Sequence, residues 1–86
     1  LIHINAKWNQ DNNYPHLRGL KNVDIQMAFL EEQTPDLRSK IKAVPVILLI
    51  DKHGKPRGQW QADLTFKLNV KQEEVQDWVN RILMDQ

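Results

Sequence analysis

The sequence predicts a layered α/β domain from three features: a buried strand, a hairpin and an amphipathic helix. Residues 46–50 are an unbroken aliphatic run directly after Pro45. A run without polar alternation is typical of a strand covered on both faces, and proline is tolerated in a sheet mainly at the first position of a strand. A turn sequence follows this run, and the C-terminal part has helical periodicity. We therefore expect helices packed above and below a small sheet.

The chain opens with a segment that favours a strand. Residues 1–8 are short and rich in β-branched and aliphatic side chains, so we expect a strand that ends near Trp8. Residues 9–15 are dense in Asn, Asp and Pro, which favour turns and helix caps. Pro15 suits the first turn of a helix, so a short helix is expected through residues 16–20.

A second strand and a second helix precede Pro45. Residues 23–29 begin with an alternation of apolar and polar side chains, which predicts a strand. Thr34, Pro35 and Asp36 then place a capping hydroxyl, a proline at the first helical position and an acid in the first turn. The helix that starts there is expected to run to about Lys42.

The segment after the aliphatic run predicts a hairpin and a final helix. Residues 51–54, Asp-Lys-His-Gly, are a tight-turn signal, and residues 56–61 should return as an antiparallel strand nearer an edge, because they contain proline and glycine. Asn69 is expected to cap the last helix. The apolar residues of that helix recur at helical spacing: Val75, Trp78, Val79, Ile82 and Leu83.

The amino-acid composition excludes several classes of function. With 86 residues the chain is expected to form a single domain over residues 1–86, which can be a trimmed part of a longer protein. It has no cysteine, which excludes disulfides, thiolate metal sites and thiol chemistry by its own side chains. A net charge of +1 and the absence of a long apolar stretch predict a soluble protein that binds neither membranes nor, as a rule, nucleic acid. Compartment and oligomeric state stay open, with a slight preference for the cytoplasm.

The predicted order of elements, β-α-β-α-β-β-α, with a proline at the entrance of the third strand, resembles the thioredoxin fold. Residues 1–8 resemble the first core strand of that family, which ends directly before the redox Cys-x-x-Cys motif. Asn9 and Asn12 then stand where the two cysteines stand, and residues 39–45 resemble the helix end that leads into the cis-proline, here Pro45. The resemblance implies a three-layer sandwich with a four-stranded mixed sheet, two central parallel strands plus a hairpin, and two or three helices, the first of them short.

What the resemblance implies for function is a redox-inactive domain that binds protein or an extended peptide. An amide side chain cannot replace a thiolate in disulfide exchange, whereas exposed backbone groups and an aromatic can still hold a peptide. One alternative is a domain derived from a thiol-disulfide oxidoreductase whose cysteines are lost or replaced, and another is that residues 9–13 are only a polar connection. The expected binding residues are Trp8, Asn9, Gln10, Asp11, Asn12, Val44, Pro45 and Trp60.

Other residue clusters support weaker alternatives. The three histidines, His3, His16 and His53, lack metal-ligand spacing, so neither a metal nor another cofactor is expected. Carboxylates near strand ends could hold Mg²⁺ in a metal-dependent nuclease, and a basic hairpin with an aromatic beyond it could bind nucleic acid. No catalytic motif is present, and the balance is against an enzyme. The carboxylates are Asp24, Asp51 and Asp63, and the basic residues are Lys52, His53, Lys55 and Arg57.

Overall fold

The computed structural model describes residues 1–85 and shows a four-stranded mixed sheet with helices. The fold is α/β, as the sequence predicts. In chain order the elements are β1 (Ile2–Asn5), the 3-10 turns η1 (Lys7–Asn12) and η2 (Leu17–Gly19), β2 (Gln26–Phe29), the 3-10 turn η3 (Leu30–Glu32), α1 (Pro35–Lys40), β3 (Val46–Ile50), β4 (Pro56–Gln61) and α2 (Gln72–Met84).

The strands lie in the order β2-β1-β3-β4. β1 and β2 are parallel, while β3 is antiparallel to both β1 and β4. The expectation of two central parallel strands is therefore corrected: β2 is an edge strand, and the two central strands, β1 and β3, are antiparallel. The expectation that β4 lies at an edge is confirmed.

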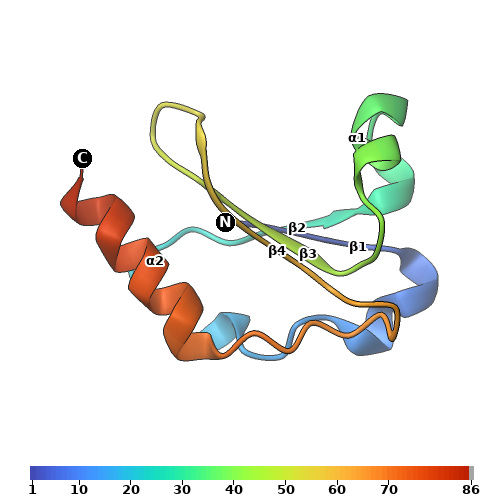
Figure 1. Cartoon of the computed structure of the whole chain (residues 1–86), viewed down its shortest axis with the longest axis horizontal. Coiled ribbons are helices and arrows are strands. Elements are labelled where there is room, and N and C mark those ends of the chain that lie inside the picture. Colours follow the sequence, from blue (N-terminus) through green and yellow to red (C-terminus); the bar gives the residue numbers. More distant parts are fainter. Residues whose placement is uncertain (86) are drawn as a thin grey trace.

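One face of the sheet carries the core. Ile47 and Leu49 of β3 belong to a buried cluster with Val75, Val79 and Ile82 of α2. Figure 1 shows α2 on the same side of the sheet as the segment that connects β1 to β2. The helical spacing of the apolar residues in α2 therefore identifies the face that is buried against β3.

The opposite face of the sheet is only partly covered. α1 contributes no buried residue, and it lies beyond the end of the sheet, on the other side from α2 (Figure 1). Leu48 is half-buried and Ile50 is exposed, whereas Val46 is buried. The aliphatic run is thus covered on both faces only near its start, where the chain leaves the Val44–Pro45 peptide bond, which is cis.

Local signals place several element boundaries. Thr34 caps α1, because its hydroxyl oxygen accepts a hydrogen bond from the Leu37 amide at 3.3 Å. Gly54 has a φ of 80° in the β3–β4 turn, a conformation that favours glycine. The Gly54 amide donates to the Asp51 carbonyl at 3.0 Å, which closes the predicted hairpin.

Other boundaries differ from expectation. β1 ends at Asn5 and not near Trp8, because the chain turns into η1. The helix expected through residues 16–20 is a single 3-10 turn, β2 begins only at Gln26, and α1 ends at Lys40. Asn69 does not cap α2: the residue at that position is Lys71, and its side chain makes no capping hydrogen bond.

Candidate functional site

Asn9 connects three segments that are distant in the sequence. It lies at a kink in η1 and is 4% exposed. Its side-chain amide nitrogen lies 3.0 Å from Asn5 Oδ1, 3.1 Å from the Phe66 carbonyl and 3.3 Å from the Val44 carbonyl. One NH₂ group has two protons, so one of the three contacts is shared. Asn9 thus holds η1 to β1, to the entrance of β3 and to the loop after β4, and it is not itself a contact surface.

A chain of amides extends this arrangement. Asn5 donates to the Asn9 carbonyl at 2.8 Å and to Asn13 Oδ1 at 2.7 Å, and its own oxygen accepts from the Ala6 amide at 2.9 Å. Asn12 donates to Asn9 Oδ1 at 2.8 Å. Asn9 and Asn12 were predicted from the sequence, whereas Asn5 and Asn13 were not. Asn5 is a buried amide inside a strand, where an unpaired polar group would be costly.

The cis-linked pair Val44 and Pro45 is adjacent to Asn9 but buried. The Val44 carbonyl accepts from Asn9, and the Pro45 carbonyl accepts from the Ala62 amide at 3.0 Å. These two residues therefore lie buried beneath η1 and are not themselves exposed to a partner. Gln10 and Asp11 of η1 are exposed.

The start of η1 offers less free backbone than expected. The Lys7 amide donates to both carboxylate oxygens of Glu31, at 2.9 and 3.1 Å, and the Asn9 amide donates to the Ala6 carbonyl at 3.0 Å. The acid occupies the amide-rich end of the turn, where negative charge is favoured. An anionic ligand would have to compete with Glu31 at this point.

Trp8 is the large exposed aromatic of this region. It is 68% exposed and meets Phe66 edge to face, with ring centroids 5.1 Å apart and an interplanar angle of 83°. No hydrogen-bond partner for its indole N–H is found among residues 1–85. We call Trp8, Phe66 and Leu64, which lies two residues before Phe66 in the same exposed loop, the Trp8 surface.

The loop that carries Phe66 is held in an unusual conformation. Phe66 has a φ of 60°, which is rare for a bulky residue. The Phe66 amide donates to the Asp63 carbonyl at 3.0 Å, and Asp63 Oδ1 accepts from the Thr65 amide at 2.8 Å and from the Thr65 hydroxyl. Hydrogen bonds from Thr65 lower the pKa of the Asp63 carboxyl. This turn leaves Leu64 87% exposed.

Trp60 belongs to a different cluster. Its indole N–H donates to a Glu74 carboxylate oxygen at 2.7 Å, and its ring meets Trp78 at a centroid distance of 6.4 Å. Both partners are on α2, so the structure does not bring Trp60 together with Trp8. Trp78 is not a core residue as its spacing suggested: it is 38% exposed and lies beside the Arg81 guanidinium.

Asp51 and Arg57, two of the groups considered for metal or nucleic-acid binding, are engaged in local contacts. Asp51 accepts from the His53 and Lys55 amides, both at 2.9 Å, and pairs with Arg57 at 3.4 Å. The Lys55 amide is the main cause of the lowered pKa of Asp51. Arg57 also pairs with Asp85 at 3.1 Å. Within the described chain, no group of three or more His, Asp or Glu side chains is placed to hold a metal ion.

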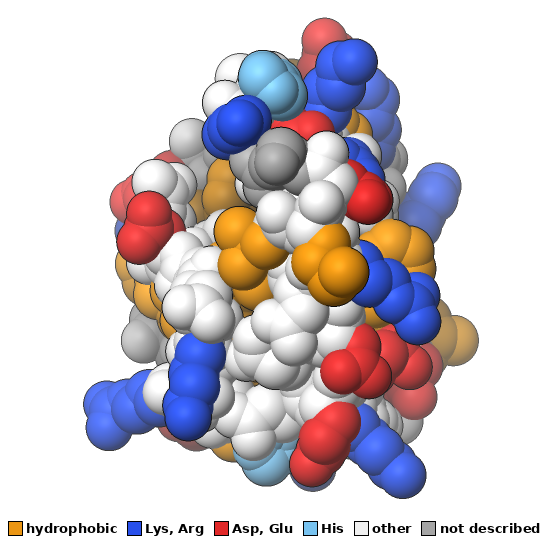
Figure 2. All heavy atoms as spheres, turned by 90° about the vertical axis from the view of Figure 1, so that its left-hand side faces the viewer, with side chains coloured by type: hydrophobic (Ala, Val, Ile, Leu, Met, Phe, Trp, Pro, Cys, Tyr) orange, Lys and Arg blue, Asp and Glu red, His pale blue; other side chains and the backbone are white. Residues whose placement is uncertain are grey.

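Acidic and basic side chains are mixed on the surface around the hairpin and α2 (Figure 2), with hydrophobic side chains exposed between them. Strong phosphate binding needs segregated positive charge, so this face gives no support to a nucleic-acid interface. None of the helices over residues 1–85 has the length and apolarity needed to cross a membrane.

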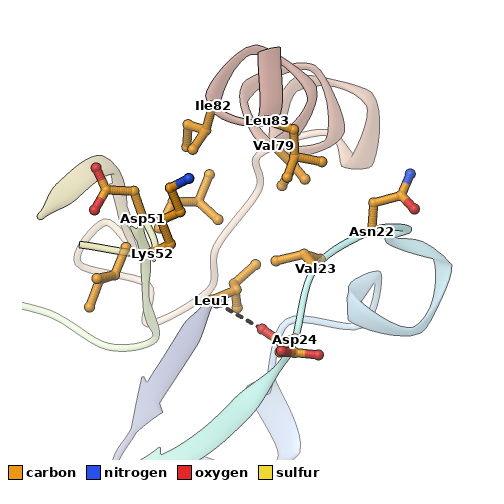
Figure 3. Close-up of a pocket in the computed structure, with 11 residues that line it drawn as sticks. Leu1, Asn22, Val23, Asp24, Asp51, Lys52, Val79, Ile82 and Leu83 are labelled. Carbon is orange, nitrogen blue, oxygen red and sulfur yellow. Dashed lines mark hydrogen bonds between the residues drawn. The ribbon is translucent and has the colours of Figure 1, made fainter. Parts of the chain in front are cut away.

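A hollow of about 300 Å³ lies between α2 and the end of the sheet. Figure 3 shows Val79 and Leu83 pointing from α2 toward Val23, and Ile82 pointing toward the side of Asp51 and Lys52. At the edge of this hollow, the Leu1 amino group donates to the Asp24 carbonyl at 2.8 Å. Its apolar walls are continuous with the core, and none of the predicted binding residues lines it.

Comparisons with models of known protein families, with curated proteins and with solved structures gave no match for this chain.

Proposed function

We propose that the chain is a redox-inactive thioredoxin-like domain that binds an extended peptide or a protein segment through the Trp8 surface. The observation that carries the proposal is the exposed Trp8, in edge-to-face contact with a Phe66 whose backbone lies at a φ of 60°. Backbone conformations of this kind cost about 1–3 kcal/mol and gather at functional sites. Exposed aromatic side chains are also the commonest anchors of protein interfaces.

The arrangement of the strands supports the thioredoxin-like part of this proposal. β1 and β2 run parallel, β3 and β4 form an antiparallel hairpin, and the order is β2-β1-β3-β4. The turn that follows β1 is hydrogen-bonded to the residue before Pro45 through Asn9. These are the two segments that the resemblance brings together at a peptide-binding edge.

The absence of cysteine decides against dithiol chemistry by this chain alone. The amide network takes the place of reactive groups: Asn9 and Asn12 are hydrogen-bonded to each other, and Asn9 also reaches both neighbouring loops. Their role in the proposal is to hold Trp8 and Phe66 in position. The partner itself contacts Trp8, Phe66, Leu64 and the exposed Gln10 and Asp11.

Selection from a random peptide library tests the binding proposal. Phage-displayed peptides would be panned on the immobilised domain, and the enriched peptides would be measured by calorimetry on Trp8→Ala and Trp78→Ala. We expect Trp8→Ala to weaken binding about 10- to 100-fold, as for an interface hot spot. Trp78→Ala is the matched control and should bind as the wild type does. Failure to enrich any peptide, or equal binding to all three proteins, would contradict the proposal.

A second candidate is a domain derived from a thiol-disulfide oxidoreductase whose cysteines are lost or replaced. The observation in its favour is that Asn9 and Asn12 lie in one turn with their side chains in contact at 2.8 Å. We expect the double variant Asn9→Cys/Asn12→Cys to form an intramolecular disulfide under mild oxidation and to reduce insulin. Thiol titration and mass spectrometry would detect the disulfide. Two thiols that stay free under oxidation would refute the correspondence of these positions with the cysteines.

A further inference from the structure

The two edges of the sheet differ in how they are protected against pairing with another chain. β4 begins with Pro56 and Arg57, and the register of β3 and β4 shifts after Leu49. Proline, charge and register irregularities are features that keep an edge strand from accepting a further strand. At the other edge, residues 25–29, Ile-Gln-Met-Ala-Phe, contain neither proline nor charge, and β2 pairs with β1 in regular register. β2 is therefore the unprotected edge.

The free backbone groups of this edge are those of Met27. The Gln26 amide donates to the Leu1 carbonyl at 2.9 Å, so Gln26 faces β1. Because the hydrogen-bonding groups of successive residues in a strand point in alternate directions, the N–H and C=O of Met27 point away from β1. No strand lies on that side within residues 1–85. Two residues further on, the Phe29 carbonyl accepts from the Gln33 side chain at 3.0 Å, so the free edge is short and centred on Met27.

A groove of about 530 Å³ lies beside this edge. Tyr14 and Leu17 line it and are buried, while Ile25 and Met27 line it from the side of β2 and are 36% and 55% exposed. Every second side chain of a strand added to Met27 would lie over this groove. Aliphatic side chains would gain most there, because they cover apolar surface that is now in water.

Arg18 is the charged residue of the groove. Of the described residues that line the groove it alone has a charge, it is exposed, and its side chain has no ion pair or hydrogen bond within residues 1–85. Asn13 also borders a hollow beside residues 27–29, so the lining segment extends from the Phe29 end at Asn13 to the start of β2 at Arg18. A ligand carboxylate near the start of β2 is therefore complementary to Arg18.

This charge favours a different chain over a second copy as the occupant. A second copy that paired through its own residues 25–29 would bring no carboxylate from its paired strand to Arg18, because these five residues are uncharged. An acidic peptide segment can satisfy both the Met27 backbone and Arg18.

We propose that the outer edge of β2 binds an extended peptide segment of a partner protein by strand addition, with aliphatic side chains over the groove and an acidic side chain beside Arg18. The backbone N–H and C=O of the peptide pair with those of Met27. The peptide runs antiparallel to β2, since antiparallel pairing is the more stable arrangement per residue. Main-chain bonds of this kind supply affinity, and alternate side chains supply selectivity. This surface shares no residue with the Trp8 surface, so the inference does not rest on the proposed function.

Nuclear magnetic resonance of the backbone amides tests the proposal. The probe is acetyl-Val-Thr-Val-Thr-Glu-amide, in which the valines and the glutamate share one face when the peptide is extended. Without peptide, the Met27 amide should exchange with D₂O faster than the Ala28 amide, which faces β1. With peptide, the Met27 amide should shift saturably and exchange at least about fivefold more slowly.

The Trp8 indole N–H reports on the other surface in the same spectra and should not shift. A Met27 amide that is unaffected up to the solubility limit of the peptide would overturn the proposal. So would a saturable shift confined to the Trp8 indole, which would place the peptide on the Trp8 surface instead.

Two matched peptides separate strand addition from apolar contact. N-methylation of the central valine removes the N–H that pairs with the Met27 carbonyl, and it should weaken binding about tenfold or more. N-methylation of the second threonine removes an N–H that points away from β2, and it should change binding less than about twofold. Equal losses for the two peptides would contradict pairing with the strand edge.

The role of Arg18 is tested with a peptide that has glutamine in place of glutamate. This peptide should bind the wild type about two- to fivefold more weakly than the probe does, and Arg18→Gln should abolish the difference. Lys52→Gln, in the β3–β4 turn, is the matched control and should keep the difference. The same preference for glutamate in Arg18→Gln as in the wild type would overturn the proposal. Protection of the Met27 amide that rises with protein concentration in the absence of peptide would also overturn it, because a second copy would then occupy the edge.

Discussion

Two aromatic pairs in this protein share a geometry but differ in their surroundings. Trp8 meets Phe66 at 83°, and Trp60 meets Trp78 at 82°, so both are edge-to-face contacts. In the second pair the indole N–H of Trp60 donates to Glu74, and Trp78 is covered by Arg81. The Trp60–Trp78 pair therefore has a structural role in fixing α2 on the sheet.

The Trp8–Phe66 pair lacks such partners. Trp8 is largely exposed, and the carbonyl of Phe66 is held by Asn9 in a backbone conformation that few bulky residues adopt. Buried hydrogen bonds thus hold this pair in place, although the contact leaves most of Trp8 exposed. Ring geometry alone therefore does not distinguish a structural aromatic pair from a candidate binding pair, whereas exposure and hydrogen-bonded support do.

The largest expected effect comes from removing the support of the exposed pair. Asn9→Ala leaves the carbonyls of Val44 and Phe66 without their side-chain donor and removes one of the two donors to Asn5 Oδ1, which keeps the Ala6 amide. We expect a loss of about 2–4 kcal/mol in the free energy of unfolding, measured by urea denaturation, because buried polar groups lose their partners. Asn12→Ala removes one bond to Asn9 and is the matched control, with a loss of about 1 kcal/mol or less. Equal losses in the two variants would contradict the central role of Asn9.

Truncating the structural pair should have the next largest effect. Trp60→Ala removes a half-buried ring and its hydrogen bond to Glu74, and we expect a loss of about 2 kcal/mol by urea denaturation. Trp60→Phe keeps the ring contact but not the hydrogen bond and should lose about half as much. A neutral Trp60→Ala would show that this pair does not hold α2.

Trp8→Ala should barely change stability. The ring is 68% exposed and its partner Phe66 stays in place, so we expect a loss of at most about 1 kcal/mol. Thermal unfolding of the two tryptophan variants side by side tests the contrast between the pairs. If Trp8→Ala were as destabilising as Trp60→Ala, the Trp8 surface would be part of the structure and not a surface kept free for a partner.

The smallest expected effect concerns the turn that presents Phe66. Hydrogen bonds from Thr65 lower the pKa of Asp63, so the folded protein holds that carboxylate charged more readily than the unfolded chain does. The stabilisation is complete above the unfolded pKa of about 3.9 and is lost as pH falls through the lower folded pKa. Asp63→Asn should lack this acid-dependent part, measured by unfolding between pH 2 and pH 5. Parallel acid profiles for wild type and variant would exclude a role for the Asp63 charge.

Strong local signals predicted much of the fold. The proline before an aliphatic run located β3, the hairpin turn and its strand matched β4, and Thr34 marked the start of α1. The periodicity of α2 identified Val75, Val79 and Ile82 as buried but overestimated the burial of Trp78 and Leu83, which are both exposed. The early end of β1 was missed because residues 6–8 carry no proline or glycine that would announce a turn.

The candidate site could be predicted only in part. Trp8, Asn9 and Val44 were identified from their places along the chain, and the structure brings Asn9 to Val44. Phe66 was missed because its contact with Asn9 spans 57 positions and has no local sequence signal. Trp60 was grouped with Trp8 because alternation along a strand tells which face a residue takes but not which helix residue it meets there.

The Trp8 surface can form only after Asn9 has made its contacts with distant parts of the chain. A single side chain joins residues near the start of the chain to Val44 and to Phe66, 57 positions away. A nascent or proteolytically shortened chain that lacks the loop after β4 has no Phe66 for Trp8 to meet. The Trp8 surface therefore forms only when the loop that carries Phe66 is present, and local opening of that loop in the native state should expose Trp8, Asn9 and Phe66 to hydrogen exchange as one unit.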